Sequence, residues 1–222
     1  MRVSFLHTLE SNKRLFGDTA ERLGVAGENL RHELRPDLRE AVQRAGTMPA
    51  DVRAEASHRL LALAAEADVV ILTCATLGAA ADDIESPPVP IVRADVALAV
   101  EANRMGGKIA VLCAVESTIE PTRQLFERHA TDKTTSIDVI LVERAWALFT
   151  SGNANDAREC YAVIAAAAND AFDAGADVVA YAHPWMAAAL DLADKDRRPL
   201  DSAHAALRTA MQAAGKSAGK SA

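Results

Sequence analysis

The sequence lacks long apolar runs and blocks of basic residues, and both absences limit what the protein does. No apolar stretch is long enough to cross a bilayer, and the segment that begins at Met1 contains no signal-peptide core. Lysine and arginine are dispersed along 222 residues whose formal charge is −7, whereas proteins that bind nucleic acid concentrate positive charge. We therefore expect a soluble cytoplasmic protein that binds neither membrane nor nucleic acid.

Several motifs that carry chemistry are also missing. The sequence has no GxGxxG or GxxxxGK(S/T) phosphate loop, no HExxH pair and no GxSxG serine. Its six histidines lack metal-ligand spacing, and its three cysteines are too far apart for a CxxC motif. The cysteines are therefore expected to be reduced thiols, and the sequence predicts no metal site.

The sequence does contain two pairs of similar segments. Residues 67–78 (ADVVILTCATLG) and 176–187 (ADVVAYAHPWMA) share their first four residues, and their alignment sets His183 opposite Cys74. Residues 2–12 (RVSFLHTLESN) and 108–118 (KIAVLCAVEST) each place a basic residue before an aliphatic strand and a Glu-Ser pair after it. Two matches in the same order indicate a chain built from two similar halves.

Strand and helix patterns alternate through both halves, which predicts parallel sheets with ligands at the carboxyl ends of their strands. Half of the residues are apolar, enough for a substantial core. The expected fold class is α/β, with two pseudo-symmetric halves, each a short parallel sheet flanked by helices, and an active-site cleft between them. Besides the first strand and the run before Cys74, strands are expected at 30–34, 91–92, 108–113, 137–142 and 176–182. The main helices are expected at 12–23, 36–46, 49–67, 95–105, 120–130, 155–174, 185–193 and 202–214.

The domain boundaries follow from the duplication. We expect the first half to span residues 1–97 together with a C-terminal helix at 198–214, and the second half to span 98–197. Residues 215–222 repeat Gly-Lys-Ser-Ala, a low-complexity composition that predicts a disordered tail.

Cys74 is the sharpest candidate for chemistry. It follows a β-branched, aliphatic run typical of a strand buried on both faces, and small and hydroxyl residues after it begin a helix. A thiol at a helix N-terminus is exposed to backbone N–H groups and to the helix dipole, which favour the thiolate. The alternative is a buried cysteine that packs as a small apolar residue.

His183 is the candidate partner, because the duplication places it opposite Cys74 and imidazole titrates near neutral pH. The alternative is a packed or hydrogen-bonded histidine at a turn beside Pro184 and Trp185. His7 and Cys113 form the other matched pair and are expected to line the pocket.

Ser117 and Thr118 begin the helix that follows the first strand of the second half. Hydroxyls and free backbone N–H groups at a helix N-terminus bind carboxylates well, although simple N-capping would also explain both residues. Ser11 and Asn12 occupy the matching place in the first half. Cys160, within an apolar stretch of a helix, is expected in the core.

These motifs, in this order, resemble the aspartate/glutamate racemase superfamily, which includes hydantoin racemases, maleate isomerases and arylmalonate decarboxylases. The resemblance extends over most of the chain. It rests on His7-Thr8, Cys74-Ala75-Thr76, Ser117-Thr118 and residues 176–186.

The resemblance implies a mechanism without pyridoxal phosphate, metal or other cofactor. Two cysteines on opposite faces of a small carboxylate exchange its α-proton, while hydroxyls and backbone N–H groups hold the carboxylate. Cys74 matches the first cysteine, with His7, Thr8, Ala75, Thr76, Ser117 and Thr118 as substrate-binding candidates. Where the family has Gly-Cys-Thr, this chain has Ala182-His183-Pro184, and Ala75 replaces a common asparagine.

Three interpretations remain open at this point. Cys74 and His183 act as a mixed pair in a racemase or epimerase, Cys74 alone acts on one face in a decarboxylase or isomerase, or the protein binds a small carboxylate without catalysis. The racemase-type enzyme is favoured, with a substrate other than free aspartate or glutamate. The resemblance further implies a homodimer or higher homo-oligomer.

Overall fold

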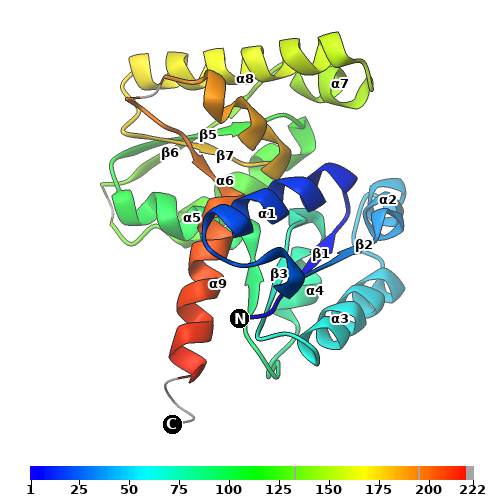
Figure 1. Cartoon of the computed structure of the whole chain (residues 1–222). Helices are drawn as coiled ribbons and strands as arrows, with labels where there is room; N and C mark the ends of the chain where they lie inside the picture. The colour runs from blue at the N-terminus through cyan, green and yellow to red at the C-terminus, as the bar shows by residue number, and fades with distance from the viewer. Residues whose placement is uncertain (133, 195, 219–222) are drawn as a thin grey trace. The chain divides into compact units, whose positions relative to one another are not determined.

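The computed structural model describes residues 1–132, 134–194 and 196–218, and the chain divides into two compact units. The first unit comprises Met1–Ala97 and the chain from Ala203 onwards, and the second comprises Leu98–Ser202 (Figure 1). Each unit contains one four-stranded parallel sheet.

The sheet of the first unit has the strand order β2-β1-β3-β4. Its two central strands are fully buried runs of mostly branched or aromatic side chains, which suits strands covered on both faces. The edge strands are shorter or partly exposed. The strands are β1 (Val3–His7), β2 (Leu30–Leu34), β3 (Val69–Leu72) and β4 (Ile91–Arg93).

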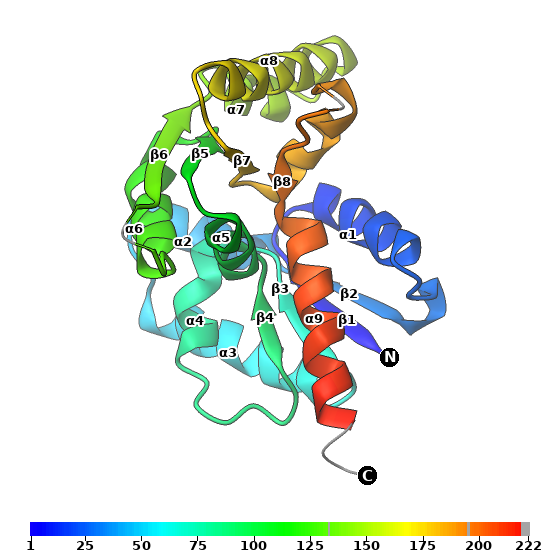
Figure 2. The same ribbon diagram turned by 90° about the vertical axis from the view of Figure 1, so that its left-hand side faces the viewer.

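Helices cover both faces of this sheet because the right-handed crossovers from β1 to β2 and from β2 to β3 run in opposite directions across the sheet. The β1–β2 connection carries α1, and the β2–β3 connection carries α2 and α3, so α1 and α3 lie on opposite sides of the central strands (Figure 2). The helical elements of this unit are α1 (Glu10–Arg22), η1 (Gly27–Asn29), α2 (Pro36–Ala45), α3 (Ala50–Ala64), η2 (Ala75–Leu77), α4 (Gly78–Asp82), the start of α5 (Ala94–Met105) and α9 (Ser202–Ala218).

The second unit repeats this topology with the strand order β6-β5-β7-β8. The long helix α8 lies along one face of the sheet and α6 lies on the other (Figure 1). The strands are β5 (Lys108–Cys113), β6 (Ser136–Leu141), β7 (Val178–Tyr181) and β8 (Leu200–Asp201), and the helical elements are η3 (Glu116–Thr118), α6 (Ile119–Arg128), α7 (Ala145–Thr150), α8 (Ala154–Asp173) and η4 (Pro184–Leu192).

The repeated Ala-Asp-Val-Val phrase has a structural cause at the amino ends of the central strands. In the first unit the Arg2 backbone N–H donates to the Asp68 carboxylate at 2.8 Å, and the Asp68 N–H donates to the Arg2 carbonyl at 2.9 Å. Lys108 and Asp177 make the same two bonds in the second unit, both at 2.8 Å. Each aspartate thus hydrogen-bonds to the backbone of the neighbouring parallel strand at the point where the two strands begin to pair. The predicted pair of similar α/β halves is confirmed.

Some elements differ from the sequence prediction. The helix expected at 185–193 is a 3₁₀ segment, η4, and the strand β8 was not predicted. The last helix extends to Ala218, into the segment 215–222 for which we expected disorder, and residues 219–222 lie outside the described chain. No helix in the described residues is both long and apolar enough to cross a membrane.

Candidate active-site residues

Cys74 lies at the carboxyl edge of the first sheet, two residues beyond the end of β3. Its backbone is extended (φ −122°, ψ 111°), and its carbonyl accepts the Leu77 N–H at 3.2 Å to begin η2. The residue is 8% exposed, whereas Ala75 and Thr76 are exposed. The Cys74 thiol is therefore nearly buried, and it lies between the end of β3 and the exposed turn η2.

The helical segment that follows Cys74 is short. The three-residue turn η2 leads directly into α4, which has only five residues. A macrodipole is the sum of aligned peptide units, so these short segments stabilise a thiolate less than a long helix would.

His7 is fully buried at the end of β1, and both of its ring nitrogens are hydrogen-bonded. Nδ1 lies 2.9 Å from Oγ1 of Thr73, and Nε2 lies 2.9 Å from Nδ1 of His32. Burial is the main cause that lowers the pKa of His7 to about 3, with smaller contributions from His32 and Lys13. Burial also lowers the pKa of His32, again with a contribution from Lys13. Both rings are therefore neutral at pH 7.

Two further polar residues lie near this edge in the first unit. Thr8 is 2% exposed and follows His7 directly. Asn12 is equally buried, and among the described residues its Oδ1 has no hydrogen-bond partner. Sequence reasoning gave Asn12 a minor place and missed His32 and Thr73, which only the pairing of β1 with β2 and β3 brings to His7.

His183 occupies the corresponding place in the second unit, two residues beyond the end of β7. Its backbone is extended (φ −101°, ψ 131°), and its carbonyl accepts the Met186 N–H at 3.0 Å to begin η4. Nε2 is shielded from solvent and has no hydrogen-bond partner among the described residues. Burial lowers the pKa of His183 to about 4, so the imidazole is neutral at pH 7.

A group of aromatic side chains fixes the His183 ring. The ring stacks on Trp185 with a centroid separation of 5.8 Å and an angle of 8° between the planes. Trp185 in turn stacks on Phe149 at 4.0 Å and contacts Trp146 at 6.1 Å. Trp185 is 4% exposed, so the support is buried. His183 therefore has a defined ring plane without a hydrogen bond at Nε2.

The candidates after β5 are divided between buried and exposed positions. Cys113 is fully buried, its Sγ lies 3.6 Å from Oγ1 of Thr122, and burial raises the pKa of its thiol. The Thr118 hydroxyl donates to the Val115 carbonyl at 2.6 Å, which stabilises the turn η3. Ser117 is exposed in the same turn. Ser117 is thus the more accessible of the two predicted hydroxyls.

The strand registers make Cys74 and His183 structurally equivalent. Leu6 pairs with Leu72 in the first sheet, and Leu112 pairs with Tyr181 in the second. Each candidate follows its paired strand by two residues, has extended backbone and starts a 3₁₀ segment. His7, Thr8, Ala75 and Thr76 share the first unit with Cys74, whereas Ser117 and Thr118 share the second with His183.

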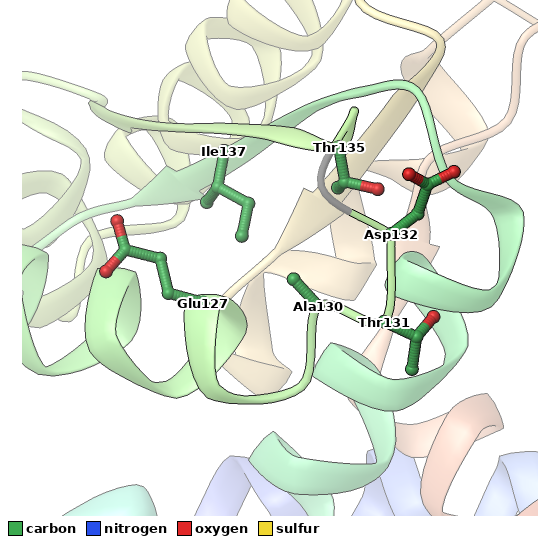
Figure 3. Close-up of a pocket in the computed structure, with 6 residues that line it drawn as sticks. All are labelled: Glu127, Ala130, Thr131, Asp132, Thr135 and Ile137. Carbon is green, nitrogen blue, oxygen red and sulfur yellow. The ribbon is translucent and has the colours of Figure 1, made fainter.

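The described chain holds no group of metal ligands at these residues, and a surface pocket of the second unit is lined by other residues. No group of three histidine, cysteine or acidic side chains in the described chain is arranged to hold a metal ion. A surface pocket of the second unit lies between the end of α6 and the start of β6, at the amino edge of the sheet (Figure 3). Its lining residues are Glu127, Ala130, Thr131, Asp132, Thr135 and Ile137. The pocket is therefore at the opposite edge from His183.

Comparison with solved structures gives matches over nearly the whole chain. An aspartate racemase from Picrophilus torridus superposes with a TM-score of 0.72 and 11% identity, covering 97% of this chain and 95% of that one. An allantoin racemase from Klebsiella pneumoniae gives 0.68 and 12%, covering 98% and 89%. An unliganded arylmalonate decarboxylase gives 0.53 and 12%, covering 97% and 93%.

Neither a scan against protein-family models nor a search of curated proteins finds a match. The structural likenesses therefore establish the fold, which both racemases and a decarboxylase share.

Proposed function

We propose that this chain, which has the two-domain fold of the aspartate/glutamate racemase superfamily, is a cofactor-independent enzyme of the racemase or epimerase type. Its substrate is a small carboxylate or hydantoin-like molecule with an acidic α-proton. The observation that carries the proposal is the equivalence of Cys74 and His183, each two residues beyond the central strand that pairs with β1 or β5.

In this proposal His183 takes the α-proton from one enantiomer and Cys74 supplies a proton to the opposite face. A neutral imidazole is the form that a base requires, and His183 has this form at pH 7. The C–H bond breaks as the His183 imidazole gains the proton, and the electron pair of that bond passes to an enolate-like intermediate. The thiol proton of Cys74 then forms the new C–H bond, and the other enantiomer uses the two groups in reverse.

The enolate needs hydrogen-bond donors that are already oriented. Ser117 and Thr76 are exposed hydroxyls in the turns that follow β5 and β3, and we assign them to the substrate carboxylate. Thr118, Thr8 and the backbone of Ala75 adjoin these positions and complete the proposed set. Exposure supports Ser117, Thr76 and Ala75 more directly than it supports the buried Thr8.

A second candidate is one-sided chemistry by Cys74 alone, as in a decarboxylase or isomerase. The enclosed Nε2 of His183 favours it, because an imidazole shielded from solvent exchanges its proton slowly. The structural similarity to an arylmalonate decarboxylase also supports this reaction class as a candidate. The two candidates differ in whether His183 is required for loss of optical purity.

The test is proton NMR of chiral α-substituted carboxylates and hydantoins incubated with the enzyme in D₂O. The proposal expects loss of the α-proton signal together with loss of optical purity, both abolished by Cys74→Ser and by His183→Ala. His183→Cys, which supplies an acid/base thiol at the same position, is expected to retain part of the racemisation.

Other outcomes identify the alternatives. Deuterium uptake with retained configuration, or release of CO₂, would assign one-sided chemistry, and racemisation by His183→Ala would remove His183 from the mechanism. A bound panel member without any exchange would leave a carboxylate-binding protein. Analytical ultracentrifugation tests the homodimer that the resemblance implies.

A further inference from the structure

We propose that His7 is a positioning residue, which acts with His32 and Thr73 to fix the main chain that carries Cys74. The inference deepens the proposed function and rests on it only for the catalytic readout. Its starting point is that both ring nitrogens of His7 are already hydrogen-bonded within the first unit and that the side chain is fully buried. His7 thus has no ring nitrogen left for a substrate.

The donor and the acceptor of each hydrogen bond around His7 can be assigned, because the Thr73 hydroxyl has a carbonyl acceptor. The Thr73 hydroxyl donates to the Leu6 carbonyl at 3.2 Å, so its oxygen accepts the remaining bond from the Nδ1–H of His7. Nε2 of neutral His7 then accepts from the Nδ1–H of His32. The bonds run from His32 through His7 and Thr73 to Leu6, and every donor in this chain has an acceptor.

Packing holds the two imidazole rings in the plane that these bonds need. The His32 ring stacks on Phe5 with a centroid separation of 4.7 Å and an interplanar angle of 6°. The His7 ring lies 5.5 Å from Phe5 and 5.2 Å from His32, nearly parallel to both. Phe16 of α1 contacts His7 from the side at 5.8 Å. Rotation of either ring would therefore disturb a buried aromatic stack.

Thr73 links the hydrogen-bonded His7 to the thiol, because Thr73 directly precedes Cys74 and directly follows the last residue of β3. Its backbone N–H donates to the Leu6 carbonyl at 3.1 Å, the same carbonyl that accepts its hydroxyl. Backbone and side chain of one residue are thus tied to β1. The peptide that leads into Cys74 has correspondingly little freedom.

The second unit has no equivalent of this arrangement. The strand registers place Cys113 at the position of His7, Ala182 at that of Thr73 and Val139 at that of His32. Ala182 keeps the backbone bond to the Leu112 carbonyl, at 3.0 Å, but alanine and valine have no polar side chain to extend it. At these positions the chain of polar side chains is present only in the unit that holds Cys74.

Two matched pairs of variants test the role in the full-length protein. Thr73→Val removes the hydroxyl at nearly constant shape, and Thr73→Ser restores it. His7→Gln places an amide near Nε2 and loses the bond to Thr73, whereas His7→Asn keeps a donor near Nδ1 and loses the bond to His32. The first readout is the rate at which iodoacetamide alkylates Cys74, measured by peptide mass spectrometry across pH, with Cys74→Ser as the blank.

A positioning role predicts that Thr73→Val and His7→Gln change the alkylation rate of Cys74 about tenfold or more and shift its pH profile. Thr73→Ser stays near the wild type, and His7→Asn, which keeps the donor to Thr73 but loses the bond to His32, changes the rate less than His7→Gln does. With a substrate in hand, kcat is expected to fall about ten- to a hundredfold at nearly constant KM, the size of effect that a small misplacement produces. Far-UV circular dichroism checks that each variant is folded.

Unchanged alkylation and unchanged kcat in folded Thr73→Val and His7→Gln would overturn the inference. An equal change in all four variants would also overturn it, because the effect would then be general loosening of the core. If no substrate is turned over by the wild type, the proposed function fails while the alkylation of Cys74 still decides the role of His7.

Discussion

Acid is expected to destabilise the first unit through His7. The pKa of His7 is lowered from 6.5 to about 3, chiefly by burial, with contributions from His32 on β2 and Lys13 on α1. The folded protein therefore holds His7 neutral at pH values where the unfolded chain binds a proton. The stability that depends on neutral His7 is fully present above pH 6.5 and is lost progressively as the pH falls toward 3.

The size of the effect follows from these two pKa values. At pH 5 the unfolded state is largely protonated at His7 and the folded state is not, which lowers the free energy of unfolding by about 2 kcal/mol relative to pH 7. At pH 4 the loss reaches about 3 kcal/mol. The lowered pKa of His32 adds to the loss in the same direction.

Urea unfolding at pH 7 and pH 5 measures this loss, with His7→Asn as the variant that cannot titrate. Circular dichroism follows both units, whereas Trp146 and Trp185 report on the second unit alone. The drop in unfolding free energy between the two pH values should be about 2 kcal/mol smaller in His7→Asn than in the wild type. His58→Asn, which removes an imidazole with a 71% exposed side chain, is the control. Equal drops in the wild type and His7→Asn would refute the linkage.

Three further predictions concern other parts of the chain. Gly107→Ala should destabilise the protein by about 1–3 kcal/mol more than Gly106→Ala, because both glycines have positive φ but only at Gly107 would a Cβ clash with the Asp177 carboxylate. Thermal unfolding of the two variants compares them. Catalysis that uses His183 as base should persist at pH 5 and decline as the pH falls through about 4, which a pH–rate profile measures. Asp68→Ala should lower the free energy of unfolding by about 1 kcal/mol at pH 7. Because the hydrogen bond from the Arg2 backbone N–H lowers the pKa of Asp68, the difference in unfolding free energy between the variant and the wild type should vanish well below pH 3.8, as measured by urea unfolding.

The alternating elements and the duplication were predictable because they depend on local pattern. Val69–Leu72 and Val178–Tyr181 are short apolar runs with clear boundaries. Each directly follows an aspartate whose carboxylate accepts a hydrogen bond from the neighbouring strand's backbone. The resemblance read from the sequence is confirmed at the level of the fold. The strand β8 was missed because two residues carry no periodicity, and only its pairing with β7 makes it a strand.

The contacts of His7 were not predictable, because they depend on register. His7 meets residues 25 and 66 positions away, and their meeting requires that β1 lie between β2 and β3 with Phe5 opposite His32. The strand registers show which residues of the two halves are structurally equivalent, and the equivalent pairs bear on function. Residues that match, such as Asp68 and Asp177, maintain the sheets. Equivalent positions that differ give the two units different side chains near their candidate residues: hydrogen-bonded His7 and Thr73 precede Cys74 in the first unit, whereas Cys113 and Ala182 stand at those positions in the second.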